Sequence, residues 1–237
     1  MADSPLPYAL AAYADRAALA RALAAHVAQA LLARMAKDGA ASLAVSGGRT
    51  PALFLETLSG APLDWGRITV TLVDERWVPE TSARSNAALV RAHLLKGEAA
   101  RARFVPLYTG APTPEDGLAD AEARVAALPL PFAAAVLGMG DDGHTASFFP
   151  GAAGLGAAID PAAPALLAAV RAAAAGEPRI TFTLPPLLAA DTLLLHIEGT
   201  VKREVLGAAS RPGAVEAMPI RAVLLNARRP LDVLWCP

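Results

Sequence analysis

The sequence predicts an α/β fold, with one mostly parallel β-sheet between two layers of helices. Short apolar runs that suit buried strands alternate along the chain with segments of helical periodicity. Parallel strands need crossover connections, which are usually helices, so this alternation favours a parallel sheet covered on both faces. No repeat, low-complexity linker or shift in composition divides the chain, so we expect one domain over residues 1–237.

The first half of the chain opens with a long helix. From about Asp15 to Asp38, large apolar residues recur at every fourth position, and Gly39 is placed to end the helix. A buried strand at 42–46 runs into SGGRTP, where Thr50 can cap a helix and Pro51 can occupy its first position. The later elements of this half are a strand over 67–75, a helix over 86–96 between Ser85 and Gly97, a strand over 103–107 and a helix from Thr113–Pro114 to about Leu128.

The second half continues the alternation. The Pro- and Gly-rich segments 109–117 and 150–164 are expected to be loops that leave and rejoin one core. In sheets of this kind, ligands bind beyond the carboxyl ends of the strands, so polar residues that follow strands are candidates for a site. The expected elements are strands over 132–138, 179–184, 192–198 and 231–236, and helices over 200–209 and 219–227.

Composition and charge exclude several classes of protein. The net charge of −1 supplies no field that would gather a polyanion, so we expect no nucleic-acid partner. Charges or prolines interrupt every apolar stretch before it reaches a membrane-spanning length. Asp3, Pro5 and Pro7 argue against a secretory leader, and the single cysteine, Cys236, suits a reducing compartment and a buried place in the last strand. We expect a cytoplasmic protein with no membrane partner.

The segment 137–151, LGMGDDGHTASFFPG, contains a G-x-G-x-x-G spacing. A dinucleotide site would need a long helix next and an acid at the end of a second strand, but Pro150 and the glycines after it prevent that helix. What remains is a glycine turn after a buried strand that presents Asp142 and His144. Imidazole suits proton transfer at neutral pH, and a nearby carboxylate can orient it. The alternative is a structural turn beside a structural histidine.

Two further segments follow strands. In SGGRTP, the backbone of Gly47 and Gly48 can approach an anion at the start of a helix, with Ser46 and Arg49 beside it; the alternative is a tight turn without a ligand. In VDERWVP, three consecutive charges begin at Asp74 and cannot share one direction, so at least one faces the site. An arginine there, Arg76, suits negative charge developing on an oxygen; the alternative is a solvated ion-pair cluster.

Two isolated cations complete the candidates. Arg179 precedes a strand, and Lys202 lies in the first turn of a helix, where a positive charge opposes the helix dipole unless an anion lies between them. The alternative for Lys202 is an ordinary surface lysine. The four histidines lie far apart in the sequence and no cysteine cluster is present, so we expect no metal site. Three of them are interpreted as structural: His26, His93 and His196.

Taken together, these segments resemble the 6-phosphogluconolactonase family, in the group that includes glucosamine-6-phosphate deaminase. The resemblance covers nearly the whole chain in order: SGGRTP, DERWVP, SNAALVRAHLL, GMGDDGHTASFFPG, RITFTLPPLLAAD and GTVKREVL. It implies a Rossmann-like sheet of the deaminase/lactonase type. In deaminases the segment that corresponds to DGHTASFFP resembles DGHIAFNEP, with a glutamate where this chain has Phe149. Deaminases also carry a tyrosine after the Asp-Glu pair, where this chain has Arg76. Both differences favour the lactonase. Arg84 departs from the lactonase pattern, in which an acid often precedes the Ser-Asn pair.

The resemblance implies hydrolysis of 6-phospho-D-glucono-1,5-lactone to 6-phosphogluconate in the oxidative pentose phosphate pathway, without a metal or cofactor. His144 would activate water for attack on the lactone carbonyl, Asp142 would orient His144 or support the turn, and Arg76 would stabilise the oxyanion. The expected substrate-binding residues are Ser46, Gly47, Gly48, Arg49, Asp74, Arg179 and Lys202.

Two other functions remain open from the sequence. One is a sugar-phosphate deaminase or isomerase that uses Asp74 as a base at C2, which Phe149 disfavours. The other is a non-catalytic sugar-phosphate sensor, for which no extra domain is present. In each case the expected partner is a small sugar phosphate, and we expect the protein to be a monomer.

Overall fold

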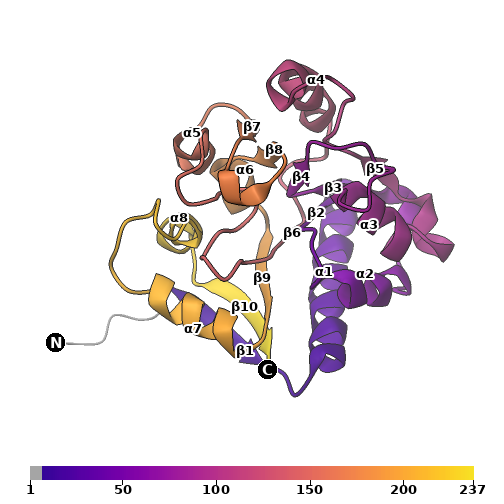
Figure 1. Ribbon diagram of the computed structural model, residues 1–237. Coiled ribbons are helices and arrows are strands. Elements are labelled where there is room, and N and C mark those ends of the chain that lie inside the picture. Colours follow the sequence, from indigo (N-terminus) through magenta and orange to yellow (C-terminus); the bar gives the residue numbers. More distant parts are fainter. Residues whose placement is uncertain (1–6) are drawn as a thin grey trace.

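A seven-stranded sheet forms the centre of the structure, a computed structural model that describes residues 7–237 apart from the side chain of Ala174 (Figure 1). All neighbouring strands in it run parallel. Residues 1–6 lie outside the described residues. They include Asp3 and Pro5, two of the residues that argue against a secretory leader. In spatial order the strands are β1 (Tyr8–Ala12), β10 (Leu231–Cys236), β9 (Thr192–Glu198), β6 (Ala134–Leu137), β2 (Ala41–Val45), β3 (Ile68–Leu72) and β5 (Arg103–Val105).

Helices cover both faces of this sheet. Figure 1 shows α1, α2 and α3 on one side and α7 and α8 on the other, which confirms the predicted three-layer α/β fold. The helices are α1 (Arg16–Asp38), α2 (Ala52–Ser59), α3 (Asn86–His93), α4 (Pro114–Ala126), α5 (Leu155–Ile159), α6 (Leu184–Leu188), α7 (Thr200–Ala209) and α8 (Ile220–Asn226), with 3-10 turns at Trp65–Arg67, Gly97–Arg101 and Ala173–Ala175.

The long helix α1 begins and ends where its local sequence predicts. The Asp15 carboxylate accepts a hydrogen bond from the Ala18 amide at 2.7 Å, which satisfies one of the free N–H groups of the first turn. Gly39 adopts a left-handed conformation (φ 84°), and its amide donates to the Met35 carbonyl. The predicted apolar stripe of Leu19, Leu23, Val27, Leu31 and Met35 is buried against the sheet.

A second, three-stranded antiparallel sheet lies beside the main one, in the order β4 (Asp74–Arg76), β8 (Arg179–Phe182), β7 (Leu167–Val170). Two expectations from the sequence are wrong here. The expected strand 67–75 is two strands in different sheets, and the strand expected from 179 does not belong to the parallel sheet. The chain changes sheets at Val73, whose amide donates to Val45 of β2 while its carbonyl accepts from Phe182 of β8. This switch carries the charges that follow β3 out of the main sheet.

Some helix boundaries also differ from expectation. α2 begins at Ala52, and the carbonyl of Pro51 accepts its first helical hydrogen bond, so the helix starts one residue later than predicted and without a Thr50 side-chain cap. α3 ends at His93, because the amides of Leu94 and Leu95 both donate to the Val90 carbonyl and the regular pattern stops.

Four elements were not expected from the sequence: β1, β7, α5 and α6. The five-residue helix α5 lies inside the segment 150–164, which was expected to be a loop, and it begins after Gly154 in a left-handed conformation. Within residues 7–237, β1 pairs only with β10, at the other end of the chain. Three of its five residues are exposed, and its sequence YALAA has no alternation of apolar and polar residues. β7 is rich in alanine, a residue depleted in strands, and is stabilised by its pairing with β8. Both strands therefore depend on partners that are distant in sequence.

Candidate active site

A cavity of about 420 Å³ lies at the carboxyl ends of β2, β6 and β9, beside the small sheet. This is the edge at which parallel sheets bind ligands. Every predicted site residue except Asp142 lines the cavity, and Asp142 contacts it through His144. The predicted residues that line it are Ser46, Gly47, Gly48, Arg49, Asp74, Arg76, His144, Arg179 and Lys202.

The turn after β6 holds a histidine–carboxylate pair. His144 Nδ1 lies 2.6 Å from Asp142 Oδ1, and the His144 amide donates to the same oxygen at 3.1 Å. The hydrogen bond to His144 holds the pKa of Asp142 below its usual value, so this carboxylate is ionised at neutral pH. With Nδ1 occupied by Asp142, Nε2 is the ring nitrogen that can accept a proton. The pair therefore has the arrangement of a general base and its orienting group.

Two glycines of this turn, Gly140 and Gly143, are required by its geometry. Gly143 has a φ of +78°, which favours glycine. A Cβ on Gly140 would lie 2.2 Å from the His144 ring, too close for any side chain. Gly140 and Gly143 thus serve the histidine and the turn.

Phe149 packs against the flank of His144. Their ring centroids are 4.4 Å apart, and the Arg179 guanidinium lies over the Phe149 ring at 5.3 Å. An apolar ring therefore occupies the side of His144 where the resemblance places a glutamate in deaminases. This contact explains in physical terms why Phe149 disfavours deaminase chemistry.

The three charges of β4 point in alternate directions, as predicted for an extended chain. Asp74 and Arg76 face the cavity, whereas Glu75 is fully buried on the other side. The Asp74 carboxylate accepts a hydrogen bond from Ser147 Oγ at 2.5 Å and lies 3.8 Å from Arg179 Nη1. Asp74 is thereby fixed in the cavity wall between two partners.

One end of the Arg76 guanidinium is anchored and the other is free for a ligand. Nη1 donates to the Arg84 carbonyl at 2.7 Å and to Asn86 Oδ1 at 2.8 Å. Asn86 is held in turn by donating from Nδ2 to the Asp74 carbonyl. Nε is buried without a hydrogen-bond partner among the described residues. The free edge of this guanidinium suits an anionic oxygen.

Glu75 ties β4 to the start of α3. Its carboxylate accepts hydrogen bonds from the amides of Arg76, Asn86 and Ala87 and from Ser85 Oγ. Burial raises the pKa of Glu75, although all four donors act in the opposite direction. Through these contacts Glu75 fixes the backbone that carries Arg76 and Asn86.

Replacement of Glu75 by alanine is expected to destabilise the fold by about 3 kcal/mol or more, because it leaves several buried donors unsatisfied. The free energy of unfolding in urea measures this loss. Glu80→Ala is the matched control, since Glu80 lies between β4 and α3, pairs with exposed Arg91 of α3, and should cost less than about 1 kcal/mol. Equal losses in the two variants would contradict the role of Glu75.

The SGGRTP turn packs tightly against Asn86 and β6. Ser46 Oγ accepts a hydrogen bond from the Gly138 amide at 3.1 Å, and Gly48 has a φ of +93°. A Cβ on Gly47 would lie 1.8 Å from Asn86 Oδ1, so only glycine fits there. No hydrogen bond from the Gly47 or Gly48 amide to another described residue is present. These amides are therefore available to an anion at the cavity.

Three buried side-chain nitrogens have no hydrogen-bond partner within residues 7–237, and all three belong to residues that line this cavity: Arg76 Nε, Arg179 Nε and His196 Nε2. An unsatisfied buried polar group costs about 1–3 kcal/mol, so folded proteins contain few of them. Burial also lowers the pKa of Arg179, which is only 7% exposed. The two unsatisfied guanidinium nitrogens, on Arg76 and Arg179, indicate a site built for a ligand rich in oxygen atoms.

Among the cavity residues that were not predicted, Asn86 and His196 have buried polar side chains. Asn86 was seen only as part of a helix start, yet its amide links Asp74 and Arg76. His196 was interpreted as structural, whereas it lines the cavity. Its place near the carboxyl end of a predicted strand was the available signal. His26 and His93 lie in α1 and α3 and do not line the cavity.

Two other sequence features have plain structural counterparts. Cys236 is buried in β10, as predicted. Arg84, which departs from the lactonase pattern, pairs with Glu177 at the cavity rim.

Within the described part of the chain, no cluster of three or more His, Cys, Asp or Glu side chains is arranged to hold a metal ion. Among the same residues, no helix combines the length and the apolar character needed to span a membrane.

Comparison with known proteins places the chain among sugar-phosphate enzymes. Residues 14–235 match the family model of glucosamine-6-phosphate isomerases/6-phosphogluconolactonase. The 6-phosphogluconolactonase of Rhizobium meliloti (strain 1021) is 52% identical over 95% of this chain and 97% of its own length. The 6-phosphogluconolactonase of Pseudomonas aeruginosa is 48% identical over 98% of this chain and 97% of its own length.

The similarity extends to a solved structure. The crystal structure of a 6-phosphogluconolactonase from Shewanella baltica OS155 superposes with a TM-score of 0.94 at 38% identity, covering 97% of this chain and 98% of that one. Sequence identity and fold thus agree over almost the entire length of both chains. The chain belongs to the 6-phosphogluconolactonase family.

Proposed function

We propose that this protein hydrolyses 6-phospho-D-glucono-1,5-lactone to 6-phosphogluconate. The observation that carries the proposal is the His144–Asp142 pair facing the same cavity as the free edge of Arg76. A proton acceptor and an anion-stabilising donor are the two groups that lactone hydrolysis needs. The relatives that share half of this sequence are named 6-phosphogluconolactonase, which supports the same substrate here.

The reaction begins when His144 Nε2 takes a proton from water as the water oxygen attacks C1 of the lactone. Asp142 stabilises the imidazolium that forms. The carbonyl oxygen becomes an oxyanion that accepts hydrogen bonds from the guanidinium of Arg76. The bond between C1 and the ring oxygen then breaks, and His144 returns its proton to that oxygen as it becomes the C5 hydroxyl. The new carboxylic acid ionises in water.

The phosphate group of the substrate holds the ring in place for this attack. In this proposal the amides of Gly47 and Gly48 donate to the phosphate at the start of α2, where the helix dipole favours an anion. Lys202 and Arg179 supply positive charge, and Arg49, which is exposed at the rim, adds to it. Ser46 and Asp74 complete the contacts with the substrate.

A coupled assay tests the activity directly. Glucose 6-phosphate is oxidised enzymatically to generate the lactone, and its disappearance is followed with and without the purified protein. Hydrolysis well above the spontaneous rate is the expected result. Release of ammonia from glucosamine 6-phosphate would instead establish deaminase chemistry, and tight binding of 6-phosphogluconate without turnover would establish a sensor.

Replacement of Lys202 by alanine is expected to lower kcat/KM toward the phosphorylated lactone by about ten- to a hundred-fold, because a charge-assisted hydrogen bond to phosphate is lost. Kinetics on unphosphorylated glucono-1,5-lactone should be unchanged. Lys37→Ala is the control, since Lys37 is exposed in the last turn of α1 and outside the cavity. An equal loss on both lactones would show that Lys202 does not recognise phosphate.

We further infer that residues 1–237 act as one domain and as a monomer in the cytoplasm. Residues of both sheets share one hydrophobic core, which supports a single folding unit. Light scattering at assay concentrations tests the monomeric state.

A further inference from the structure

His196 combines deep burial with a place in the cavity wall. It lies in β9, two residues before the strand ends, and is only 3% exposed. Its ring packs edge-on against Phe54 of α2, with the centroids 6.4 Å apart. Nε2 has no hydrogen-bond partner among the described residues. The neighbouring strand positions hold leucine and isoleucine, so a polar ring at this depth needs a physical reason.

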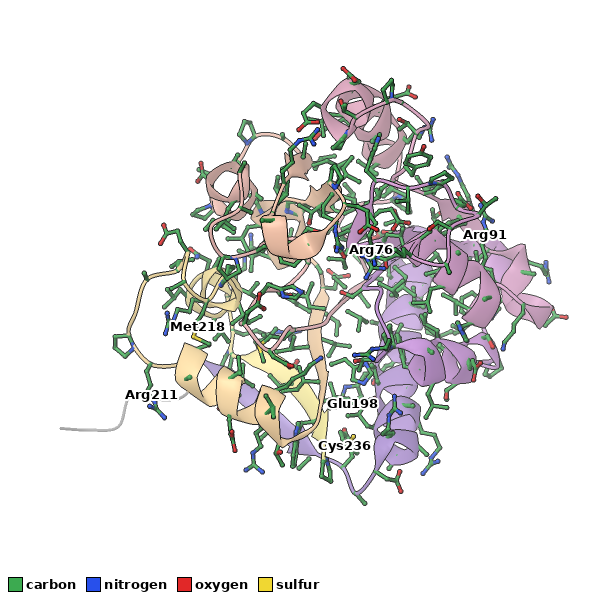
Figure 2. The ribbon with its side chains drawn as sticks, viewed as in Figure 1. Arg76, Arg91, Glu198, Arg211, Met218 and Cys236 are labelled. Atoms are coloured by element: carbon green, nitrogen blue, oxygen red, sulfur yellow. The ribbon has the colours of Figure 1, made fainter. Side chains whose placement is uncertain are left out.

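A carboxylate lies beside this ring and is held in position. Glu198 Oε1 lies 3.3 Å from His196 Nε2, close enough for charge attraction but not aligned as a hydrogen bond. Arg16 of α1 pairs with the other carboxylate oxygen at 2.7 Å. Burial acts to raise the pKa of Glu198, but contacts with His196 and Arg16 outweigh it and lower the pKa. Figure 2 shows Glu198 near Cys236, at the carboxyl end of the paired strands β9 and β10.

The imidazole of His196 has two nitrogens, and each can donate a hydrogen bond when it carries a hydrogen. The two ring nitrogens point away from each other, so a ring with Nε2 toward Glu198 presents Nδ1 on its opposite side. A ring held between a fixed carboxylate and a second anion can therefore bridge the two. Because His196 lines the cavity, the second anion would be part of the ligand.

The neighbours of His196 indicate which part of the ligand this is. Phe54, against which the ring packs, belongs to the helix that follows the Gly47–Gly48 turn. Lys202 lies six residues further along the chain, in the first turn of the helix after β9. His144, by contrast, packs on Phe149 in the segment after β6. His196 therefore groups with the glycine turn and Lys202 and not with the residues that surround His144.

We propose that His196 binds the phosphate group of the substrate, with one ring nitrogen toward Glu198 and the other donating to a phosphate oxygen beside Lys202. Glu198 and Arg16 are positioning residues that hold the ring. The proposal rests on the proposed lactonase function for the identity of the substrate, but phosphate binding by His196 is measurable without turnover.

The test uses two substitutions and a matched control. His196→Phe keeps an aromatic ring against Phe54 and removes both nitrogens, and His196→Gln keeps one polar end without the charge. His93→Phe is the control, because His93 of α3 pairs with Glu56 of α2 and lies outside the cavity. Calorimetry measures the Kd of 6-phosphogluconate, and steady-state kinetics compare phosphorylated and unphosphorylated lactones.

His196→Phe is expected to raise the Kd of 6-phosphogluconate and the KM of the phosphorylated lactone by about ten-fold, with kcat changed by less than about two-fold. His196→Gln should show a smaller rise, and His93→Phe none. Kinetics on glucono-1,5-lactone should be the same in all variants. No change in either Kd or KM, or an equal loss on both lactones, would overturn the proposal.

A measurement on the unsubstituted protein covers the case in which the variants fold poorly. Side-chain nitrogen NMR signals of His196 are followed while inorganic phosphate or 6-phosphogluconate is added. The His196 signals should shift at saturation and those of His93 should not; unshifted His196 signals would overturn the proposal. If the protein binds phosphate through His196 but hydrolyses no lactone, the phosphate site stands and the proposed lactonase function fails.

Discussion

Replacement of His144 by alanine is expected to lower kcat for lactone hydrolysis by about a hundred-fold or more, because positioned general bases contribute about 10² to 10⁴ to rate. The side chain is about one-third exposed and packs mainly on Phe149, so the melting temperature should change little. The coupled assay and a thermal melt on the same sample separate the two effects.

Two variants sharpen this test. Asp142→Asn keeps the shape of the turn but replaces the carboxylate beside Nδ1, so kcat should fall to a value between those of the unsubstituted protein and His144→Ala. His26→Ala, at an exposed position in α1, should have full activity. Turnover near the unsubstituted level in His144→Ala would mean that another group activates the water.

Replacement of Arg76 by lysine is expected to lower kcat by about a hundred-fold with a small change in KM, since an oxyanion donor acts mainly in the transition state. Lysine keeps the charge but loses the planar fork, one end of which is anchored on Arg84 and Asn86 while the other faces the cavity. Rates over a range of substrate concentrations separate kcat from KM.

Arg91→Lys is the matched control for Arg76. Figure 2 shows Arg91 at the periphery of the molecule, where it pairs with Glu80 and lies over Phe104. This control should leave kcat and KM unchanged. If Arg76→Lys raised KM and left kcat intact, Arg76 would hold the substrate without stabilising the oxyanion.

Local signals in the sequence predicted most of the main sheet and its helices. Asp15 and Gly39 define α1 through contacts within one turn of the helix, and Ser85 and Thr113 cap α3 and α4 in the same way. Such contacts involve residues three or four apart, so they are visible in the order of the letters. The strand over 192–198 and the helix over 200–209 were predicted to the residue.

Partners distant in sequence account for the elements that were missed. β1 exists because it pairs with β10, and the strand from 179 lies in the small sheet because it runs antiparallel to β4 and β7. The alternation of strands and helices does not reveal this, because an antiparallel excursion from a parallel sheet has the same local period of two.

For the candidate site, the sequence by itself determined the chemistry available after each strand: an imidazole with a nearby carboxylate, a glycine turn and a few cations. Only the tertiary structure decided how these groups meet. It turned Glu75 away from the cavity to hold α3, anchored Arg76 on Asn86, and brought His196 to the cavity wall beside Glu198 and Arg16. The physical reason is that hydrogen bonds and ion pairs between distant segments depend on how helices and sheets pack, which spacing along the chain does not specify.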